Sequence, residues 1–191
     1  DEALGTLATA AQRVETRNET WRRRIAIATG DAYRAKQDCD LARKHYLQAE
    51  ALQPLSAQDA VARSSYGLTV EAYLARGENA EALAKLQEWA ERFPADKIGG
   101  YWSLLMGRCF AHLRRYNEAV EELALAARIE PFGAYTRDIL EHLGQTHRLQ
   151  KRYGEAIEAL RSAANLLDDP GRKRIIEDQI AQIQREASSK R

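Results

Sequence analysis

Small and large apolar residues follow one another at helical spacing in four stretches of the chain. Each stretch has an alanine, a large residue four positions later and a third apolar residue three positions after that. This i, i+4, i+7 spacing places the three residues on one face of a helix. The four sets are Ala42, Tyr46 and Ala49; Ala82, Leu86 and Trp89; Ala119, Leu123 and Ala126; and Ala156, Leu160 and Ala163.

A second set of apolar positions precedes each of these predicted helices. A small residue, glycine in all but one case, is followed three positions later by a larger ring-bearing one: Gly30 and Tyr33, Val70 and Tyr73, Gly107 and Phe110, Gly144 and His147. Two helices cross closely only where one side chain is small, and the adjacent layer must supply a large one to fill the space. The pattern therefore predicts four helical hairpins, which begin near Arg23, Arg63, Gly100 and Arg137.

Prolines mark the ends of three of the second helices. Pro54, Pro94 and Pro131 each follow the apolar face of one of them. Proline cannot continue the hydrogen-bond ladder and disfavours the α conformation at the residue before it. The extra residues between repeats, 56–62 and 96–99, are expected to lengthen first helices or the turns between repeats.

The most regular stretch is residues 115–131, which nearly recurs from residue 152 onward. The two starts, residues 115 and 152, are 37 positions apart. Self-similarity at such a spacing is typical of stacked supersecondary units. The pattern resembles the tetratricopeptide repeat, a helix-turn-helix unit, over residues 23–170. The second unit departs from the family pattern at Val70 and Trp89, where small residues are usual. The fourth departs at His147, where an aromatic is usual, and at Asp168, in place of the helix-ending proline.

The resemblance implies an all-α fold, a right-handed TPR-like solenoid of helical hairpins with a capping helix at each end. We expect a single domain over 1–191. Its expected parts are an N-terminal helix at 1–22, repeats at 23–56, 63–96, 100–133 and 137–170, and a C-terminal capping helix at 171–188.

Both ends of the chain are predicted to be helical caps. After Asp169 as N-cap and Pro170 at the first helical position, one apolar stripe follows, formed by Ile176, Ile180, Ile183 and Ala187. At the other end an apolar stripe over 4–28 allows one long helix, or a separate repeat helix begun by a capping box of Thr16 with Glu19. The stripe could pair with a second copy, but its Ala and Asn positions favour intramolecular capping.

Composition excludes several classes of protein. The chain has 29 basic and 28 acidic residues and a net charge of +1, so no whole-molecule field attracts nucleic acid, and no nucleic-acid partner is expected. Cys39 and Cys109 suggest free thiols rather than a disulfide framework. No apolar run is long enough to span a membrane. We expect a soluble domain, and the start at Asp1 suggests a trimmed part of a longer, exported or anchored protein.

The sequence carries no linear signature of an enzyme. Phosphate-binding glycine loops, nucleophile elbows, Cys-x-x-Cys and His-Glu-x-x-His motifs are all missing. His142 and His147 lie about 140° apart around a helix axis, which does not suit a shared metal. We therefore predict no catalytic residues, no metal and no cofactor, and interpret His147 as a core residue.

In tetratricopeptide arrays the first helices line the concave surface, so the resemblance designates a partner-binding groove. Its residues in this chain are Arg24, Asp31, Arg34, Glu71, Tyr101, Arg108, His112, Gln145 and Arg148. Chaperone-binding members hold a terminal carboxylate with Lys and Asn, but Ile27 and Asp31 occupy those positions here, which disfavours a carboxylate clamp. Arginines with one tyrosine suit an acidic or amphipathic peptide instead.

These features predict a non-catalytic protein-protein interaction module or scaffold that binds a peptide or partner protein along the first-helix face. Two alternatives stay open. The chain could be a structural assembly domain that forms homo-oligomers through its terminal helices, or an accessory domain of a larger enzyme or membrane-associated complex.

Overall fold

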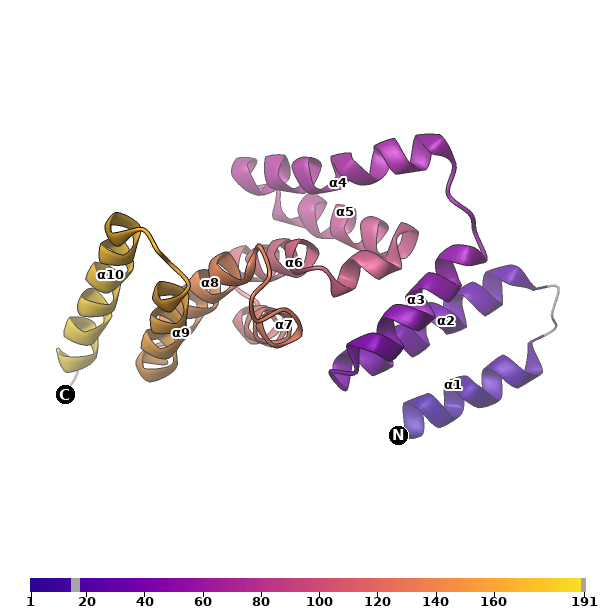
Figure 1. The fold of residues 1–191 in the computed structure, drawn as a ribbon, viewed down its shortest axis with the longest axis horizontal. Coiled ribbons are helices and arrows are strands. Elements are labelled where there is room, and N and C mark those ends of the chain that lie inside the picture. The colour runs from indigo at the N-terminus through magenta and orange to yellow at the C-terminus, as the bar shows by residue number, and fades with distance from the viewer. Residues whose placement is uncertain (15–17, 190–191) are drawn as a thin grey trace. The chain divides into compact units, whose positions relative to one another are not determined.

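The computed structural model describes residues 1–14 and 18–189, in which it places ten α-helices and one 3₁₀ helix (Figure 1). They are α1 (Glu2–Arg13), α2 (Glu19–Ala35), α3 (Cys39–Ala51), α4 (Ala57–Arg76), α5 (Asn79–Arg92), η1 (Pro94–Ile98), α6 (Gly100–His112), α7 (Tyr116–Ile129), α8 (Thr136–Leu149), α9 (Tyr153–Asn165) and α10 (Pro170–Ser188). Within the described residues, no helix has the length and apolar character needed to cross a membrane.

The chain packs as two compact units, Asp1–Trp102 (unit 1) and Ser103–Arg191 (unit 2), and the boundary falls inside α6. In unit 1, α2 packs on α3, α4 packs on α5, and η1 lies against α3 and α5. In unit 2, α8 packs on α7 and on α9, and α10 covers α9. The predicted all-α fold of helical hairpins is therefore confirmed, whereas the assignment of 1–191 to a single domain stays a prediction.

The closest helix contacts confirm the predicted register of the repeats. A β-carbon added at Gly107 would lie 2.4 Å from Leu123 Cγ, and one added at Gly30 would lie 2.5 Å from the ring of Tyr46. Both glycines were predicted to be the small residues of a crossing, and both partners are large residues of the second helix. Leu123 and Tyr46 are completely buried. The small-on-large pattern is thus what allows the helices of these two hairpins to approach.

One residue in the left-handed region joins the two helices of every hairpin. Gln37, Gly77, Arg114 and Lys151 have φ values of 65°, 75°, 59° and 62°. Each lies at the equivalent place of its repeat, in the turn between the end of the first helix and the start of the second. A single left-handed residue ends a helix and satisfies its last carbonyls. Only one of the four is glycine, so the other three turns contain strained L-residues.

The predicted insertions fall as expected in a longer first helix and in a turn. Ser56 caps α4, since its Oγ accepts from the Asp59 amide at 3.2 Å and the Asp59 carboxylate accepts from the Ser56 amide at 2.8 Å. This capping box starts α4 at Ala57, before the predicted start at Arg63. Residues 94–98 form η1, which begins with Pro94 and follows the end of α5.

The N-terminal segment is two helices rather than one. The sequence predicted a helix at 1–22, whereas α1 ends at Arg13 and α2 begins at Glu19. Asn18 caps α2 by accepting from the Trp21 amide at 3.2 Å. The proposed cap Thr16 lies outside the described residues. The separate repeat helix is therefore confirmed, with Asn18 as its observed cap.

The second hairpin departs from the small-on-large pattern of the other three. Val70 and Trp89 are both buried, although the family pattern has small residues at these positions. Gly67, nearly one turn before Val70, allows close approach of the next first helix, α6, because a β-carbon there would lie 2.4 Å from the ring of Tyr101. Tyr101 also meets the Trp89 ring edge-on at 6.1 Å. The glycine of α4 thus serves the approach of α6, and the α4–α5 hairpin has the larger Val70 where the other first helices have glycine.

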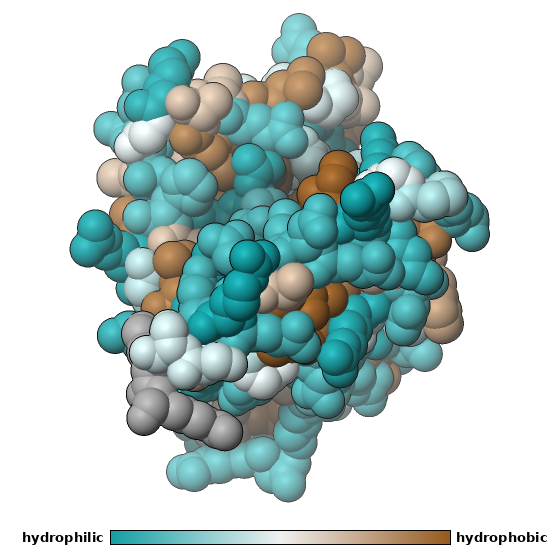
Figure 2. All heavy atoms as spheres, turned by 90° about the vertical axis from the view of Figure 1, so that its left-hand side faces the viewer, coloured by the Kyte–Doolittle hydropathy of each residue, from teal (hydrophilic) through white to brown (hydrophobic). Residues whose placement is uncertain are grey.

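The C-terminal helix α10 caps unit 2 as the sequence predicted. Asp169 Oδ1 accepts from the Gly171 amide at 2.8 Å, and Pro170 is the first helical residue. Ile176, Ile180 and Ile183 are buried in one cluster with the alanines of α9. The opposite face of α10 is polar, and the surface seen from that side is mostly hydrophilic with scattered apolar patches (Figure 2).

Candidate functional site

A cleft of about 580 Å³ runs along α2 in unit 1. Its α2 wall includes the predicted groove residues Arg24 and Asp31, with Ile27 between them at helical spacing. Leu52, which is the C-cap of α3, the following Gln53, and Glu91 near the end of α5 form the other walls. The full lining is Glu19, Thr20, Arg23, Arg24, Ile27, Ala28, Asp31, Leu52, Gln53 and Glu91. The cleft therefore combines apolar side chains, those of Ile27, Ala28 and Leu52, with charged side chains of both signs.

Arg23 closes one side of this cleft. Its Nη2 donates to the backbone carbonyl of Glu91, in the last turn of α5. Cationic side chains are favoured beside the carbonyl groups that end a helix. Burial lowers the pKa of Arg23, although Glu91 and Glu50 act in the opposite direction. Arg23 is thus a brace between α2 and α5 that also forms part of the cleft wall.

Arg24 is the exposed cation of the cleft. Its guanidinium lies 5.5 Å from the centre of the Trp21 ring, one turn earlier on α2. This distance is within the range of a cation–π contact, which restricts the side chain without neutralising its charge. The arrangement suits a carboxylate ligand, because guanidinium binds carboxylate with two parallel hydrogen bonds.

Asp31 is held in place at the other end of the cleft. Its Oδ1 accepts from Tyr46 Oη and from Lys97 Nζ, each at 2.6 Å. Lys97 Nζ also lies 5.1 Å from the centre of the Tyr46 ring. Three elements, α2, α3 and η1, therefore meet at this carboxylate. Lys97 comes from far along the chain, and sequence spacing gave no indication of this contact.

Arg34, another predicted groove residue, is only 8% exposed. Its Nε donates to the Lys97 carbonyl at 2.9 Å, and its guanidinium lies 5.5 Å from the centre of the Trp102 ring. Trp102 Nε1 in turn donates to the Leu86 carbonyl at 3.2 Å. The structure thus places Arg34 in the packing between α2, η1 and the start of α6.

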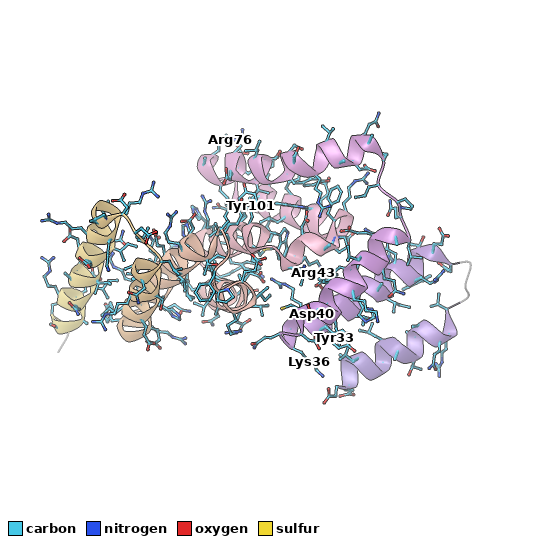
Figure 3. The ribbon with its side chains drawn as sticks, viewed as in Figure 1. Tyr33, Lys36, Asp40, Arg43, Arg76 and Tyr101 are labelled. Atoms are coloured by element: carbon cyan, nitrogen blue, oxygen red, sulfur yellow. The ribbon has the colours of Figure 1, made fainter. Side chains whose placement is uncertain are left out.

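Two further predicted groove residues of unit 1 have different surroundings. They are Glu71 of the second repeat and Tyr101 of the third. Tyr101 fills the notch at Gly67 and lies between α4 and its neighbouring helices (Figure 3). Glu71 is half-buried on α4. Neither lines the cleft along α2. The structure therefore brings together Arg24 and Asp31 in unit 1, but not Arg34, Glu71 or Tyr101.

In unit 2 the predicted groove residues Arg108 and His112 lie near His142, which is on α8, the first helix of the fourth repeat. His142 is half-buried on α8, and burial lowers its pKa to about 4, with a smaller contribution in the same direction from Arg108. The nearby Asp138 acts in the opposite direction. His142 is thus a neutral member of this face, a role that its spacing in the sequence did not indicate.

The remaining predicted groove residues of unit 2 are on the same helix, α8. Gln145 is exposed. Arg148 Nε donates to Glu186 Oε2 on α10 at 3.1 Å, so this arginine fastens the capping helix to α8. His147, interpreted as a core residue, is half-buried, and burial lowers its pKa.

No side-chain group in the described residues suggests metal chemistry. Among residues 1–14 and 18–189 there is no cluster of three His, Cys, Asp or Glu that could hold a metal ion. Cys109 is buried, which raises its pKa to about 11 and keeps the thiol protonated, whereas Cys39 is partly exposed. Thiolate is the reactive form of cysteine, so the buried thiol lacks the property of a nucleophile.

Comparison with known proteins rests on structure alone, since no family model and no curated protein matches the sequence. The complex of the TPR2AB-domain of yeast Sti1 with pHSP90 matches with a TM-score of 0.51 at 15% identity, over 98% of this chain and 78% of that chain. A crystal structure of MamA protein matches with a TM-score of 0.49 at 17% identity, over 88% and 91% of the two chains. A MamA RS-1 ArsTM double mutant gives 0.47 at 16%, over 86% and 83%.

The likeness to the TPR2AB-domain agrees with the observed array of helical hairpins. Identity at this level shows the fold alone. This chain therefore has the tetratricopeptide-repeat fold, an all-α array of helical hairpins.

Proposed function

We propose that this chain is a non-catalytic protein-interaction module that binds a peptide segment of a partner protein in the cleft along α2. The observation that carries the proposal is the cleft itself, in which an exposed arginine, Arg24, and a half-buried apolar side chain, Ile27, lie on the same wall. Peptide sites of this kind recognise an apolar anchor together with a charged neighbour. The yeast Sti1 domain of the same fold was solved as a complex with pHSP90, which supports a role in partner binding.

The chemistry of the cleft indicates an amphipathic ligand with an acidic residue. Ile27 would contact an apolar side chain, and Arg24 would pair with a carboxylate a few ångströms away. Asp31 already accepts from two donors, so it contributes little net attraction for a cation. A terminal-carboxylate clamp is not expected, because neither Ile27 nor Asp31 can donate to a carboxylate.

A random peptide library displayed on phage provides a direct test of this proposal. Selected peptides would be synthesised with a fluorophore, and their Kd measured by anisotropy against the original protein and against Arg24→Glu and Ile27→Arg. We expect selected peptides to carry Asp or Glu beside an apolar residue, and each variant to weaken binding at least about tenfold.

Arg43→Glu is the matched control, since it makes the same charge change at an exposed position of α3 outside the cleft (Figure 3). It should leave the Kd unchanged. Peptides that bind Arg24→Glu and the original protein equally well would place the binding site elsewhere. Circular dichroism would establish that every variant is folded.

A further inference from the structure

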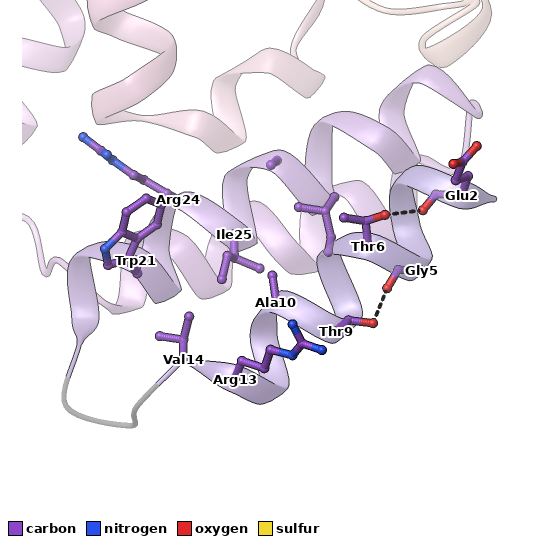
Figure 4. Close-up of a pocket in the computed structure, with 12 residues that line it drawn as sticks. Glu2, Gly5, Thr6, Thr9, Ala10, Arg13, Val14, Trp21, Arg24 and Ile25 are labelled. Atoms are coloured by element: carbon purple, nitrogen blue, oxygen red, sulfur yellow. Dashed lines mark hydrogen bonds between the residues drawn. The ribbon is translucent and has the colours of Figure 1, made fainter.

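Helix α1 covers only part of the surface on which it packs. None of its residues is buried, and its most sheltered side chains, such as Leu4 and Leu7, are half-buried against α2. A cleft of about 960 Å³ follows the groove between α1 and α2. Trp21 lines this cleft and is 53% exposed, and Ile25 lies one turn further along α2 (Figure 4). The groove is therefore an apolar surface long enough to receive another helix.

The α1 wall of the cleft is formed by the half-buried Leu7 and by a stripe of small residues with a charge at each end. The members share helical spacing and lie on one side of the helix: Glu2, Gly5, Thr6, Thr9, Ala10 and Arg13. A β-carbon added at Gly5 would have no atom within 4 Å, so the space over it is open. Small side chains allow a second helix to approach closely.

The polar groups within this stripe need no partner from outside the helix. Thr6 Oγ1 donates to the Glu2 carbonyl and Thr9 Oγ1 donates to the Gly5 carbonyl, both at 3.0 Å (Figure 4). A buried hydroxyl is costly only when it lacks a hydrogen bond. The centre of the stripe can therefore become dry without loss, in contrast to its two charged ends.

The stripe is complementary to itself in the antiparallel direction. When a second α1 lies antiparallel on the first about a two-fold axis, the position pairs that face each other are Glu2 with Arg13, Gly5 with Ala10 and Thr6 with Thr9. Both ends then form opposite-charge pairs, and small residues meet at the centre. In the parallel direction Glu2 would face Glu2 and Arg13 would face Arg13, which is repulsive.

We propose that the occupant of this cleft is α1 of a second copy of the chain, packed antiparallel in a symmetric dimer. Within the described residues neither Glu2 nor Arg13 has an ion-pair partner, so each is available to the other copy. The helix of the second copy would also shelter Trp21 and Ile25. A symmetric pair uses the same surface on both copies, as this self-complementary stripe requires.

The contact is small, and this sets the expected affinity. A three-turn helix is about 18 Å long. Contacts of this size are typical of weak association, and we expect dissociation constants of roughly ten to a few hundred micromolar. The site differs from the proposed peptide cleft, although Arg24 and Ala28 border both. The substitutions below change only α1, so each proposal can fail without the other.

Sedimentation equilibrium and light scattering of the whole chain, from about 1 µM to about 1 mM, provide the test. The mass should rise from the 21.6 kDa of one chain toward twice that value. Glu2→Arg and Arg13→Glu should each raise the dimer dissociation constant at least about tenfold, because both end pairs become like-charged. The double variant Glu2→Arg with Arg13→Glu should restore the original constant.

Mixing the two single variants gives a further and more specific result. A Glu2→Arg chain and an Arg13→Glu chain present opposite charges at both ends, so their equimolar mixture should associate although neither variant does alone. Gly5→Leu should abolish association while circular dichroism shows an unchanged fold, because its side chain projects into space that is open in one chain.

Three outcomes would overturn the proposal. The first is a mass that stays at one chain over the whole concentration range. The second is a dimer that persists unchanged in Gly5→Leu and in both charge reversals, which would place the contact elsewhere. The third is a double charge swap that fails to restore the association lost in the folded single variants.

Discussion

Replacement of Gly107 by alanine tests whether close helix contact holds unit 2 together. At an unconstrained helix position this change stabilises a protein by roughly 0.5–1 kcal/mol, because glycine loses more backbone entropy on folding. At Gly107 the new β-carbon would lie 2.4 Å from Leu123 Cγ and 2.5 Å from its Cδ2. Leu123 is completely buried, so it cannot move aside freely. Overpacking of a core costs about 1–3 kcal/mol, and we expect a net loss of about 1–2 kcal/mol in the free energy of unfolding.

Gly154→Ala makes the same chemical change where nothing opposes it. A β-carbon at Gly154, in the first turn of α9, has no atom within 4 Å. This variant should be neutral or more stable by up to about 0.5 kcal/mol. Urea denaturation followed by far-ultraviolet circular dichroism measures both variants, and opposite signs are the expected result.

Leu123→Ala allows the cause to be assigned. Alone it should destabilise the protein by about 2–5 kcal/mol through the cavity it leaves. In that background Gly107→Ala should no longer be destabilising, because its steric partner is gone, and the coupling energy should exceed about 1 kcal/mol. If Gly107→Ala proved as stabilising as Gly154→Ala, the tight crossing of α6 and α7 would not exist and the register of the third hairpin would be refuted.

Three further predictions concern single side chains. Arg114→Gly should raise the unfolding free energy by about 0.5–1 kcal/mol in urea denaturation, since φ is 59° there, and a loss would contradict the left-handed turn. His142→Gln should remove a pH dependence of the unfolding free energy that amounts to at most about 2–3 kcal/mol. Burial lowers the pKa of His142 to about 4, so protonation of this histidine disfavours the folded state. The full stability is therefore present above pH 6.5 and is lost as the pH falls toward 4. Parallel stability–pH curves for the variant and the original protein would contradict the burial of this histidine. Arg34→Met should cost about 1.5–3 kcal/mol because the Lys97 carbonyl loses a charged donor, and an unchanged urea midpoint would show that Arg34 is not part of the packing.

The fold was accessible from the sequence because its determinants are local. Gly107 with Leu123 and Gly30 with Tyr46 lie within one hairpin, where helical periodicity and a short turn fix which residues meet. Equivalent residues recur in each unit, so one recognised repeat supplied the register of the others. The strained turn at Arg114 was not predicted, because nothing in the residue type marks a left-handed conformation there.

The candidate site was only partly predictable. Arg24 and Asp31 line the cleft along α2 as one helical face requires. Arg34 belongs to the same row by spacing, yet the chain returns through η1 and buries it against the Lys97 carbonyl. Arg148 likewise follows the pattern, but Glu186 of α10 pairs with it. Periodicity assigns a residue to a face, and it does not say which later segment will cover that face.

The sequence by itself therefore determined the helices, their pairing and the small-on-large contacts of the first, third and fourth pairs, since these depend on residues close together in the chain. Only the tertiary structure decided which first-helix residues stay exposed, because that depends on η1 and α10 returning from distant positions. It also decided that α1 turns back on α2 and leaves an apolar groove beside the stripe from Glu2 to Arg13. Burial of one helix face against another is a property of the whole arrangement, and the spacing of residues along the chain cannot express it.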